Sequence, residues 1–593
     1  MGESPAPGLR PRLALRFGIK GHRPPCLARD HHQAAASACA GIFAETKQVL
    51  ADIYSEHSEL FSDEAPLIRL ISALASGADT VAAKAAMDSG IALSACLPFP
   101  KPIYSRDLSK EDWRLAEELA IEADSALAIT YYEAGDDAAY EAVGRLVLAQ
   151  SDILIAIWDG EPARGRRGTT DVVAEAIARH IPVIHINPDG SQAPILLWSG
   201  LHEEIPDQPS IDGTGRAPLD KALPMVIGAL CAPPQDGELS SLRSFLDHDG
   251  ERRESCFAWP LLLVATGARS LKAAQFRTPS FRAARSYFAP IIEPFQQLGD
   301  FGQKLTGALA YRFAVADASA SASGLQFRSS FVTNFSLAAT AVLLALSGLF
   351  FPDLKAWLIT AELLVIALII VNTRRDVKCN FHKLWINRRH LAERLRLLGL
   401  SATLGRLSLR DVEDGTTFPG WVTWYARPTA RELDLPPGHL DKEYLARVRE
   451  SALLLIDDQV SYHRSNARVM AHTNNTLHRI GDWLFIGTIL FCLAFLAAKI
   501  FASAPVEILG ISLTAIVTLP TAFFPALAAA LYGFRMQGDF AATSERSRLI
   551  AARLRKLRHS LAQDSLTYGR LVERIRRLSE IMLSDIHQWQ QQY

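Results

Sequence analysis

Two long apolar runs, separated by only two residues, constrain this chain more than any other feature. Phe331–Phe351 contains no charged side chain, and Leu354–Val371 carries only Lys355 and Glu362. Each run is long enough to cross about 30 Å of hydrocarbon as a helix. The sequence therefore predicts a transmembrane hairpin whose short turn leaves almost no chain on one side of the bilayer.

A second pair of apolar runs lies further along the chain. Trp483–Ala502 carries a single charge, Lys499, and Ile508–Phe534 carries none. The four apolar runs predict four spans. Because loops rich in Lys and Arg stay in the cytoplasm, the basic clusters after the second and fourth runs predict that both chain termini are cytoplasmic. These clusters are Arg374, Arg375, Lys378, Lys383, Arg388 and Arg389, and Arg535, Arg546, Arg548, Arg553, Arg555, Lys556 and Arg558.

Three residues inside the predicted spans have two interpretations each. Glu362 at bilayer depth either lines an ion path or bonds to a neighbouring hydroxyl group. Pro520 and Pro525 introduce either a gating kink or a static bend into the fourth span. The sequence alone leaves these alternatives open.

Charge and cysteine content narrow the class of protein. A formal net charge of -1 gives no electrostatic drive toward nucleic acid, so none is expected as a partner. The seven cysteines show no C-x-x-C spacing and are odd in number, which favours reduced thiols over a disulfide framework or a metal site. The first residues, Met1–Arg16, lack an apolar core, so no secretory signal is expected.

The region before the spans alternates short apolar runs with helix-like segments. This alternation predicts an α/β fold with a parallel, doubly wound sheet. The predicted strands are 13–19, 67–74, 91–97, 126–130, 153–158 and 183–186, and the predicted helices are 31–55, 80–89, 110–123, 138–149 and 170–179.

Three motifs follow predicted strands, where a parallel sheet binds its ligand. They are Gly21-His22-Arg23, Ser76-Gly77-Ala78-Asp79, and Asp159-Gly160 followed by Arg164–Thr170. Small residues let backbone N–H groups approach a phosphate at a helix N-terminus, and arginines add positive charge. The alternative is that the glycines only form turns and the basic loop is solvated. Three such motifs at one sheet edge favour an anion site.

The same motifs occur in a characteristic order with Leu97-Pro98, Gln150-Ser151-Asp152 and Ile181-Pro182-Val183-Ile184. Over 13–187 this order resembles the SLOG superfamily, which includes LOG-type phosphoribohydrolases, DprA-like proteins and nucleotide-sensing domains of TRPM channels and bacterial defence proteins. The resemblance implies a Rossmann-like sheet that binds a nucleotide signal, an ADP-ribose derivative or a cyclic nucleotide. The implied ligand-binding residues are Gly21, His22, Arg23, Ser76, Gly77, Ala78, Asp79, Asp159, Gly160, Arg167, Gly168, Thr169, Thr170 and Asp171.

The chain departs from the hydrolases of that superfamily at one loop. LOG-type enzymes share P-G-G-x-G-T-x-x-E, whereas this chain has Arg164–Arg166 for the first three residues and Val172 for the glutamate. A valine cannot transfer a proton, and Glu175, one turn further on, is the alternative carboxylate. The resemblance therefore implies binding without turnover, with no catalytic residue and no prosthetic group.

The membrane half contains a repeat. The basic segment Arg389–Leu398 matches Arg548–Leu557 in its arginine and apolar positions, and each follows one hairpin. Together with the long helical run before Trp483, these segments resemble the SLATT membrane effectors of bacterial conflict systems, over 311–557. That resemblance implies an oligomeric pore in the bacterial inner membrane.

The sequence divides into a nucleotide-binding domain and a membrane domain. The hypothesis is a ligand-gated, homo-oligomeric effector that permeabilises the membrane, with a nucleotide-synthesising enzyme encoded nearby as a possible partner. The alternatives are a membrane-tethered nucleotide or NAD glycohydrolase and a scaffold that binds nothing. The predicted segments are the SLOG-like 1–190, the connecting 191–310, the first hairpin with its entry helix 311–400, the cytoplasmic 401–482, the second hairpin with its Arg-rich helix 483–560, and the C-terminal helix 561–593.

Overall fold

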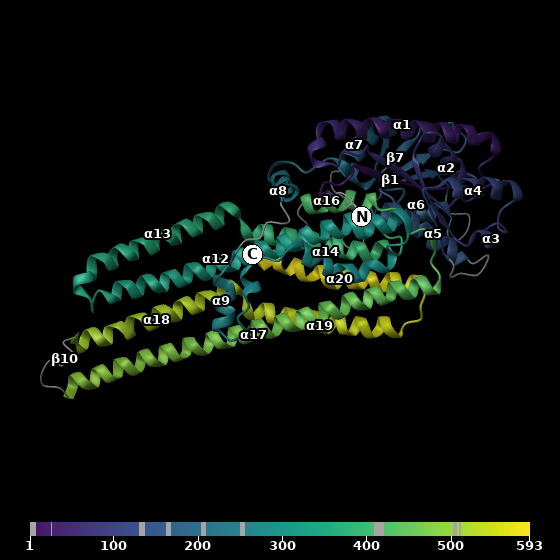
Figure 1. Cartoon of the computed structure of the whole chain (residues 1–593). Helices are drawn as coiled ribbons and strands as arrows, with labels where there is room; N and C mark the ends of the chain where they lie inside the picture. Colours follow the sequence, from purple (N-terminus) through teal and green to yellow (C-terminus); the bar gives the residue numbers. More distant parts are fainter. Residues whose placement is uncertain are drawn as a thin grey trace, which may run out of the picture.

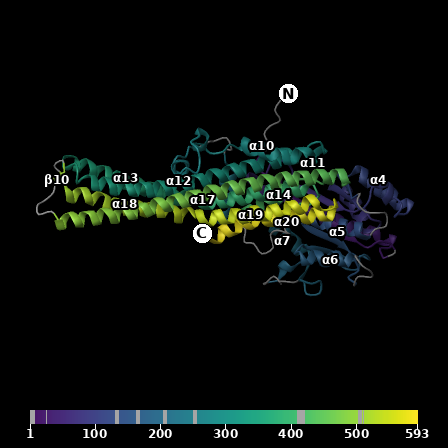
Figure 2. The ribbon, with the colours of Figure 1, turned by 90° about the horizontal axis from the view of Figure 1, so that it is seen from below.

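A nine-stranded sheet forms the centre of the N-terminal region. The structure is a computed structural model that describes residues 8–592 except 25, 130–136, 162–167, 203–208, 249–254, 408–419, 502–506 and 509–510. The α/β region lies at one end of an elongated molecule and two helical hairpins lie at the other (Figure 1). Long helices connect the two ends (Figure 2).

Six parallel strands form the middle of the sheet, and each of the six predicted strands is present within a few residues of its expected bounds. The strand order is β8-β7-β6-β5-β1-β2-β3-β4-β9. The elements are β1 (Ala14–Gly21), α1 (His32–Glu56), β2 (Leu67–Ser72), α2 (Ala78–Asp88), β3 (Ala92–Leu97), α3 (Lys101–Tyr104), α4 (Lys110–Glu122), β4 (Ser125–Ala128), α5 (Asp137–Gln150), β5 (Ile153–Ile157), α6 (Thr169–Ala178), β6 (Val183–Ile186), β7 (Ile195–Leu197), β8 (Arg216–Pro218), α7 (Leu219–Cys231) and β9 (Gly438–His439).

The sheet is mixed rather than wholly parallel as predicted. β7 pairs antiparallel with β6, and β8 pairs antiparallel with β7. Both strands lie in the segment 191–310, for which the sequence predicts only a partly helical connection. β9 pairs parallel with β4 although it comes from the helical half of the chain. These strands have only two or three residues each, too few for a strand period to be visible in the sequence.

Side chains along β1 alternate between two helical layers because successive residues of a strand point to opposite faces. Phe17 packs against Phe43 of α1, with ring centroids 5.8 Å apart. Gly18 faces α5, since a Cβ there would lie 2.9 Å from the side chain of Val147. α1 therefore covers the outer face of the sheet, and α5 covers the face toward the helical half (Figure 1).

The helical half begins with short helices and continues into four very long ones. Its elements are α8 (Asp236–Leu246), α9 (Ala258–Ala265), α10 (Phe281–Ile292), α11 (Gly299–Lys304), α12 (Ala310–Ser347), α13 (Lys355–Cys379), α14 (Phe381–Ala402), α16 (Gly420–Glu432), α17 (Lys442–Phe501), β10 (Glu507–Ile508), β11 (Ile511–Ser512), α18 (Leu513–Gly538), α19 (Phe540–Gln563) and α20 (Tyr568–Gln592).

Within the described part of the chain, four helical segments are long and apolar enough to cross a membrane, and they contain α12, α13, α17 and α18. They form the two predicted hairpins, α12 with α13 and α17 with α18 (Figure 1). The fourth helix begins at Leu513 instead of Ile508, because Ile508 belongs to the two-stranded ribbon β10–β11. α17 has 60 residues, so it extends over about 90 Å and links the sheet region to the far end of the hairpins.

The helices outside the predicted spans pack into a bundle under the hairpins. α14 packs against α12, and α19 packs against α17, so the two Arg-rich segments of the repeat occupy corresponding places. α12 begins at Ala310 and continues into the first candidate span, and α10 and α11 precede it in the chain. One hydrophobic core, which includes Phe17 of β1, Phe313 of α12 and Leu554 of α19, runs through both halves of the molecule.

Candidate functional site

The sheet changes its winding direction between β1 and β5, which lie side by side. The chain continues from β1 to β2 on one side and from β5 to β6 on the other. In open α/β sheets a ligand binds at such a point, outside the carboxyl ends of the strands. Here those ends are Gly21 and Ile157, which are register partners. The structure thus brings the motifs Gly21–Arg23 and Asp159–Gly160 together.

His22 and Asp159 hold these two strand ends in contact. The Nε2 atom of His22 lies 2.9 Å from Oδ1 of Asp159 and accepts the Asp159 backbone N–H at 3.3 Å. The backbone N–H of His22 donates to the carbonyl oxygen of Ile157 at 2.9 Å. Both side chains therefore shape the edge of the site, and Asp159 remains partly exposed to solvent.

Two glycines let the loop after β2 approach the carboxyl ends of β1 and β5. Gly77 has a φ of 93°, and an added Cβ would lie 2.7 Å from the carbonyl oxygen of His22. That carbonyl accepts the N–H of Ala78 at 3.1 Å, at the first residue of α2. At the end of β1, a Cβ on Gly21 would lie 2.6 Å from the carbonyl oxygen of Ile157 and would overlap Ala78. The second motif, Ser76–Asp79, therefore joins the other two.

We expect Gly21→Val to destabilise the protein by roughly 1–3 kcal/mol, because the added side chain has no room between β5 and α2. The matched control is Gly168→Ala, at which an added Cβ meets nothing within 4 Å and φ is -74°. Denaturant unfolding of the two variants checks the prediction. Equal stability of Gly21→Val and the native chain would show that the three strand ends are less closely packed than described.

Two buried polar atoms at this junction have no hydrogen-bond partner among the described residues. They are Oγ of Ser76 and Oδ2 of Asp79, and the two residues are 8% and 2% exposed. An unsatisfied buried polar atom costs about 1–3 kcal/mol, so it seldom persists without a reason. Both atoms stand where α2 begins, the place at which the sequence predicts a ligand. They are suited to bind hydroxyl or N–H groups of that ligand.

Positive charge surrounds the Asp79 carboxyl group. Burial raises the pKa of Asp79, and the charges of Lys20 and Arg23 act in the opposite direction. Burial also lowers the pKa of Lys20, while Asp79 raises it. Lys20, on β1, was missed in the sequence because it lies inside the strand that precedes the motif. The site therefore brings the carboxyl groups of Asp79 and Asp159 together with the basic side chains of Lys20 and Arg23.

An aromatic residue from α5 borders the site. The Arg23 guanidinium lies 4.9 Å from the ring centroid of Tyr140. Tyr140 donates its hydroxyl hydrogen to Oδ2 of Asp107 at 2.6 Å and packs edge-on against Phe99. The sequence offered no signal for Tyr140, because an isolated tyrosine in a helix carries no motif. Its ring holds Arg23 near the strand ends and adds an aromatic surface there.

The third motif forms the start of α6. The N–H of Gly168 donates to Oδ2 of Asp171 at 3.1 Å, and Thr170 Oγ1 donates to the carbonyl oxygen of Glu161 at 3.0 Å. Thr169 is buried. Asp171 and Thr170 thus have local structural roles, while Gly160, with a φ of 81°, lies in open space. Arg167 and Arg164–Arg166 lie outside the described residues.

The residues that would supply hydrolytic chemistry have other partners. Val172 packs against a small hydrophobic cluster around Val173. Glu175, the alternative carboxylate, lies 2.5 Å from Arg179 and 3.7 Å from Arg145. Glu175 is therefore already engaged in ion pairs with two arginines. Within the described ranges, no group of three His, Cys, Asp or Glu side chains could hold a metal ion.

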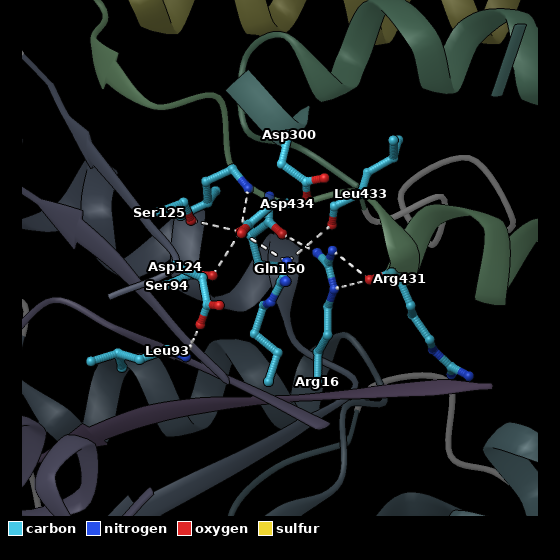
Figure 3. Close-up of polar contacts among 12 residues, drawn as sticks. Arg16, Leu93, Ser94, Asp124, Ser125, Gln150, Asp300, Arg431, Leu433 and Asp434 are labelled. Carbon is cyan, nitrogen blue, oxygen red and sulfur yellow. Dashed lines mark hydrogen bonds and ion pairs between the residues drawn. The ribbon is translucent and has the colours of Figure 1, made fainter. Parts of the chain in front are cut away.

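A second polar cluster joins the inner face of the sheet to the helical half (Figure 3). Oδ1 of Asp434, in the chain that leaves α16, accepts hydrogen bonds from Ser94 at 2.7 Å and from Ser125 at 2.6 Å. The same atom lies 2.9 Å from Nη1 of Arg69, and both side chains are at most 6% exposed. One carboxylate from the helical half thus binds three neighbouring strands, β2, β3 and β4.

Arg16 and Arg312 extend this connection in two directions. Arg16, on β1, donates to the backbone oxygen of Arg431 at 2.8 Å and to the side chain of Gln150 (Figure 3). Arg312, near the start of α12, lies 2.7 Å from Oε2 of Glu432. A continuous path of polar contacts therefore leads from β1, through the end of α16, to the helix that forms the first candidate span.

The fold and the site define a protein with two parts, a mainly parallel nine-stranded α/β domain and four helices able to span a membrane. No protein-family model matches the sequence, and no curated protein is similar to it.

Proposed function

We propose that this protein is a membrane effector that binds a nucleotide-derived signal at the carboxyl ends of β1, β2 and β5. The observation that carries the proposal is the pair of unsatisfied buried atoms, Ser76 Oγ and Asp79 Oδ2, beside Arg23 at the point where the sheet changes direction. The signal would be an ADP-ribose derivative or a cyclic nucleotide. Binding would open the four-span domain and permeabilise the inner membrane of a bacterium.

The chemistry of the site supports a ligand with sugar and phosphate groups. Asp79 would accept hydrogen bonds from ribose hydroxyls, as carboxylates in dinucleotide-binding folds do. The start of α2 and the Arg23 guanidinium would attract a phosphate, since a helix N-terminus and an arginine both favour negative charge. Tyr140 would add a surface for the base. On these grounds the α/β domain is proposed to be Rossmann-like and related to SLOG sensors.

The membrane half supports the effector part of the proposal. The repeated helices α14 and α19 each follow one hairpin, as in the SLATT effectors that the sequence resembles. Four spans in one chain are too few to enclose a wide channel, so several copies would form the pore. A nucleotide-synthesising enzyme encoded nearby would supply the signal, and both chain termini would face the cytoplasm.

We expect Arg23→Ala to weaken the binding of ADP-ribose by about 1–3 kcal/mol, the usual range for a hydrogen bond to a charged group. Calorimetric titration of the full-length protein in detergent measures it, with a cyclic dinucleotide as the second probe. Arg29→Ala is the matched control, since Arg29 is exposed and pairs with Glu111. The same affinity in native protein and Arg23→Ala, for whichever probe binds, would place the site elsewhere.

We expect no turnover of NAD or AMP, because Val172 cannot transfer a proton and Glu175 is held by Arg179 and Arg145. Chromatography of nucleotides incubated with the purified protein tests this prediction. Release of nicotinamide or adenine at several molecules per second would be an ordinary enzymatic rate and would favour the glycohydrolase alternative. A boiled sample gives the background.

A further inference from the structure

A cavity of about 370 Å³ lies in the helical bundle, away from the sheet edge. Its described lining comes from α9, α12, α14, α17, α19 and α20 and from the loop after α9. Arg328 lines it and stands just before the first predicted span, which begins at Phe331. The volume falls within the roughly 300–1,000 Å³ typical of ligand pockets. The cavity therefore adjoins the expected cytoplasmic border of the membrane.

Arg328 is held between two aromatic rings in this cavity. Its guanidinium carbon lies 5.3 Å from the ring centroid of Trp259 and 4.8 Å from that of Trp385. Among the described residues no carboxylate lies within ion-pair distance of Arg328. Two rings fix the direction of its charge and leave its N–H groups to bind an acceptor.

The lining as a whole has an excess of positive charge. Five of its described residues are arginines, and its single carboxylate is Glu393. That carboxylate already pairs with Arg389 at 2.6 Å and with Arg396 at 2.7 Å. Glu393 therefore cannot balance the other arginines, which are Arg269, Arg277, Arg328 and Arg546.

One of those four arginines has a partner outside the lining. Arg546 lies 3.1 Å from Oδ2 of Asp539. For Arg269, Arg277 and Arg328, the described structure contains no carboxylate within ion-pair distance. No carboxylate of the described structure thus pairs with these three guanidinium groups, which leaves them available to bind an anion.

Two residues of the lining each carry a buried polar atom that has no hydrogen-bond partner in the described structure. Nδ1 of His463, a residue that is 8% exposed, has no hydrogen-bond partner in the described structure, and neither does Oε1 of Gln275. Both residues line the cavity. A phosphate that keeps one proton, or a headgroup hydroxyl, could donate to these atoms while its charged oxygens bind the arginines. The polar groups of the cavity are therefore complementary to such an anion.

We propose that this cavity binds a phosphate group, carried by an anionic phospholipid headgroup or by a soluble phosphate compound. Basic pockets between transmembrane helices at the cytoplasmic side bind phosphorylated headgroups through the same chemistry. A phosphate here would bridge α12 to α19 through Arg328 and Arg546, so it would stabilise one arrangement of the two hairpins. This site is independent of the nucleotide site at the strand ends.

The test uses full-length protein in a neutral detergent with two separate probes. Native mass spectrometry measures retention of phosphatidylglycerol against phosphatidylcholine, and calorimetric titration measures inorganic pyrophosphate. We expect one of the two anions to bind, and Arg328→Gln to weaken that binding at least about tenfold, as for loss of a charge-assisted contact. The double variant Arg269→Gln with Arg277→Gln should weaken it as well, and both side chains are exposed, so folding is not at issue.

The matched control is Arg374→Gln, which removes the same charge from an exposed position after the second span and outside the lining. It should change the affinity less than about twofold. Binding of phosphatidylglycerol alone would assign the cavity to a lipid headgroup, and binding of pyrophosphate alone would assign it to a soluble phosphate. Binding of neither probe, or an equal loss in Arg374→Gln, would overturn the proposal.

Discussion

Asp434→Ala should destabilise the folded protein by about 3–5 kcal/mol, the usual cost of removing one partner from a buried ion pair. The variant leaves Arg69 charged and buried, since Arg69 and Asp434 are 5% and 6% exposed. It also removes the acceptor for the hydroxyl groups of Ser94 and Ser125. The sheet and the helical half would then separate more easily. Denaturant unfolding, followed by circular dichroism, measures the change.

Asp457→Ala is the control for that measurement. Asp457 also accepts from an arginine, Arg558, but the two side chains are 49% and 44% exposed. Exposed ion pairs contribute about 0–1 kcal/mol, so this variant should unfold almost as the native protein does. If both variants lose the same stability, Asp434 does not have the structural role assigned to it.

The largest functional effect is expected at the contact between Arg312 and Glu432. We expect the double variant Arg312→Met with Glu432→Leu to fold and to bind the signal, but to lose signal-induced permeabilisation. Replacing a buried ion pair with apolar residues of similar volume is often neutral for stability, whereas Glu432→Leu alone leaves a buried charge and should cost about 3–5 kcal/mol. Calorimetry measures binding, and release of a trapped dye from proteoliposomes measures permeabilisation.

The reason for this expectation is that Arg312 fixes α12 to the segment that holds β1. In the structure it lies 2.7 Å from Glu432 and also donates to the backbone oxygen of Arg10 at 3.1 Å. Without these contacts, a conformational change at the carboxyl ends of β1, β2 and β5 would lose one of the connections through which it could reach α12 and the first span. Full dye release from the double variant would show that the signal travels by another route.

The energy that gating requires favours an oligomer. Moving a closed-to-open equilibrium from 1:99 to 99:1 needs a preference of about 5.5 kcal/mol for the open state. One site typically contributes about 1–3 kcal/mol of coupling, so several copies opening together would supply enough. For this reason we propose that the protein acts as a homo-oligomer whose α/β domains associate more strongly when the signal is bound.

The features that could be predicted from the sequence are those with a strong local pattern. Four helices cross the membrane in the prediction and are long and apolar in the structure, because an uninterrupted apolar run of about 20 residues is typical of a membrane-spanning helix. The six parallel strands were likewise visible as apolar runs such as 153–158, which contains the fully buried β5. The common location of the motifs that follow these strands could then be predicted, because parallel strands end at one edge of a sheet.

The features that could not be predicted depend on contacts between distant parts of the chain. Asp434 accepts a hydrogen bond from Ser94, which is 340 positions away in the sequence, and neither residue belongs to a motif that would predict this contact. β9 has only two residues, and Tyr140 and Lys20 belong to no motif. The arginines of the repeat were recognised, but only the structure shows that Arg328 stands between two tryptophans. Tertiary contacts, and not local propensity, determine all of these.

Release of a self-quenched dye from proteoliposomes tests the central claim most directly. Native protein should release the dye when ADP-ribose or a cyclic dinucleotide is added and should retain it otherwise. Arg23→Ala should need a roughly 5–150-fold higher concentration of the same compound, which corresponds to the 1–3 kcal/mol expected for its binding. Equal leakage with and without the compound, or an unchanged response in Arg23→Ala, would contradict the account.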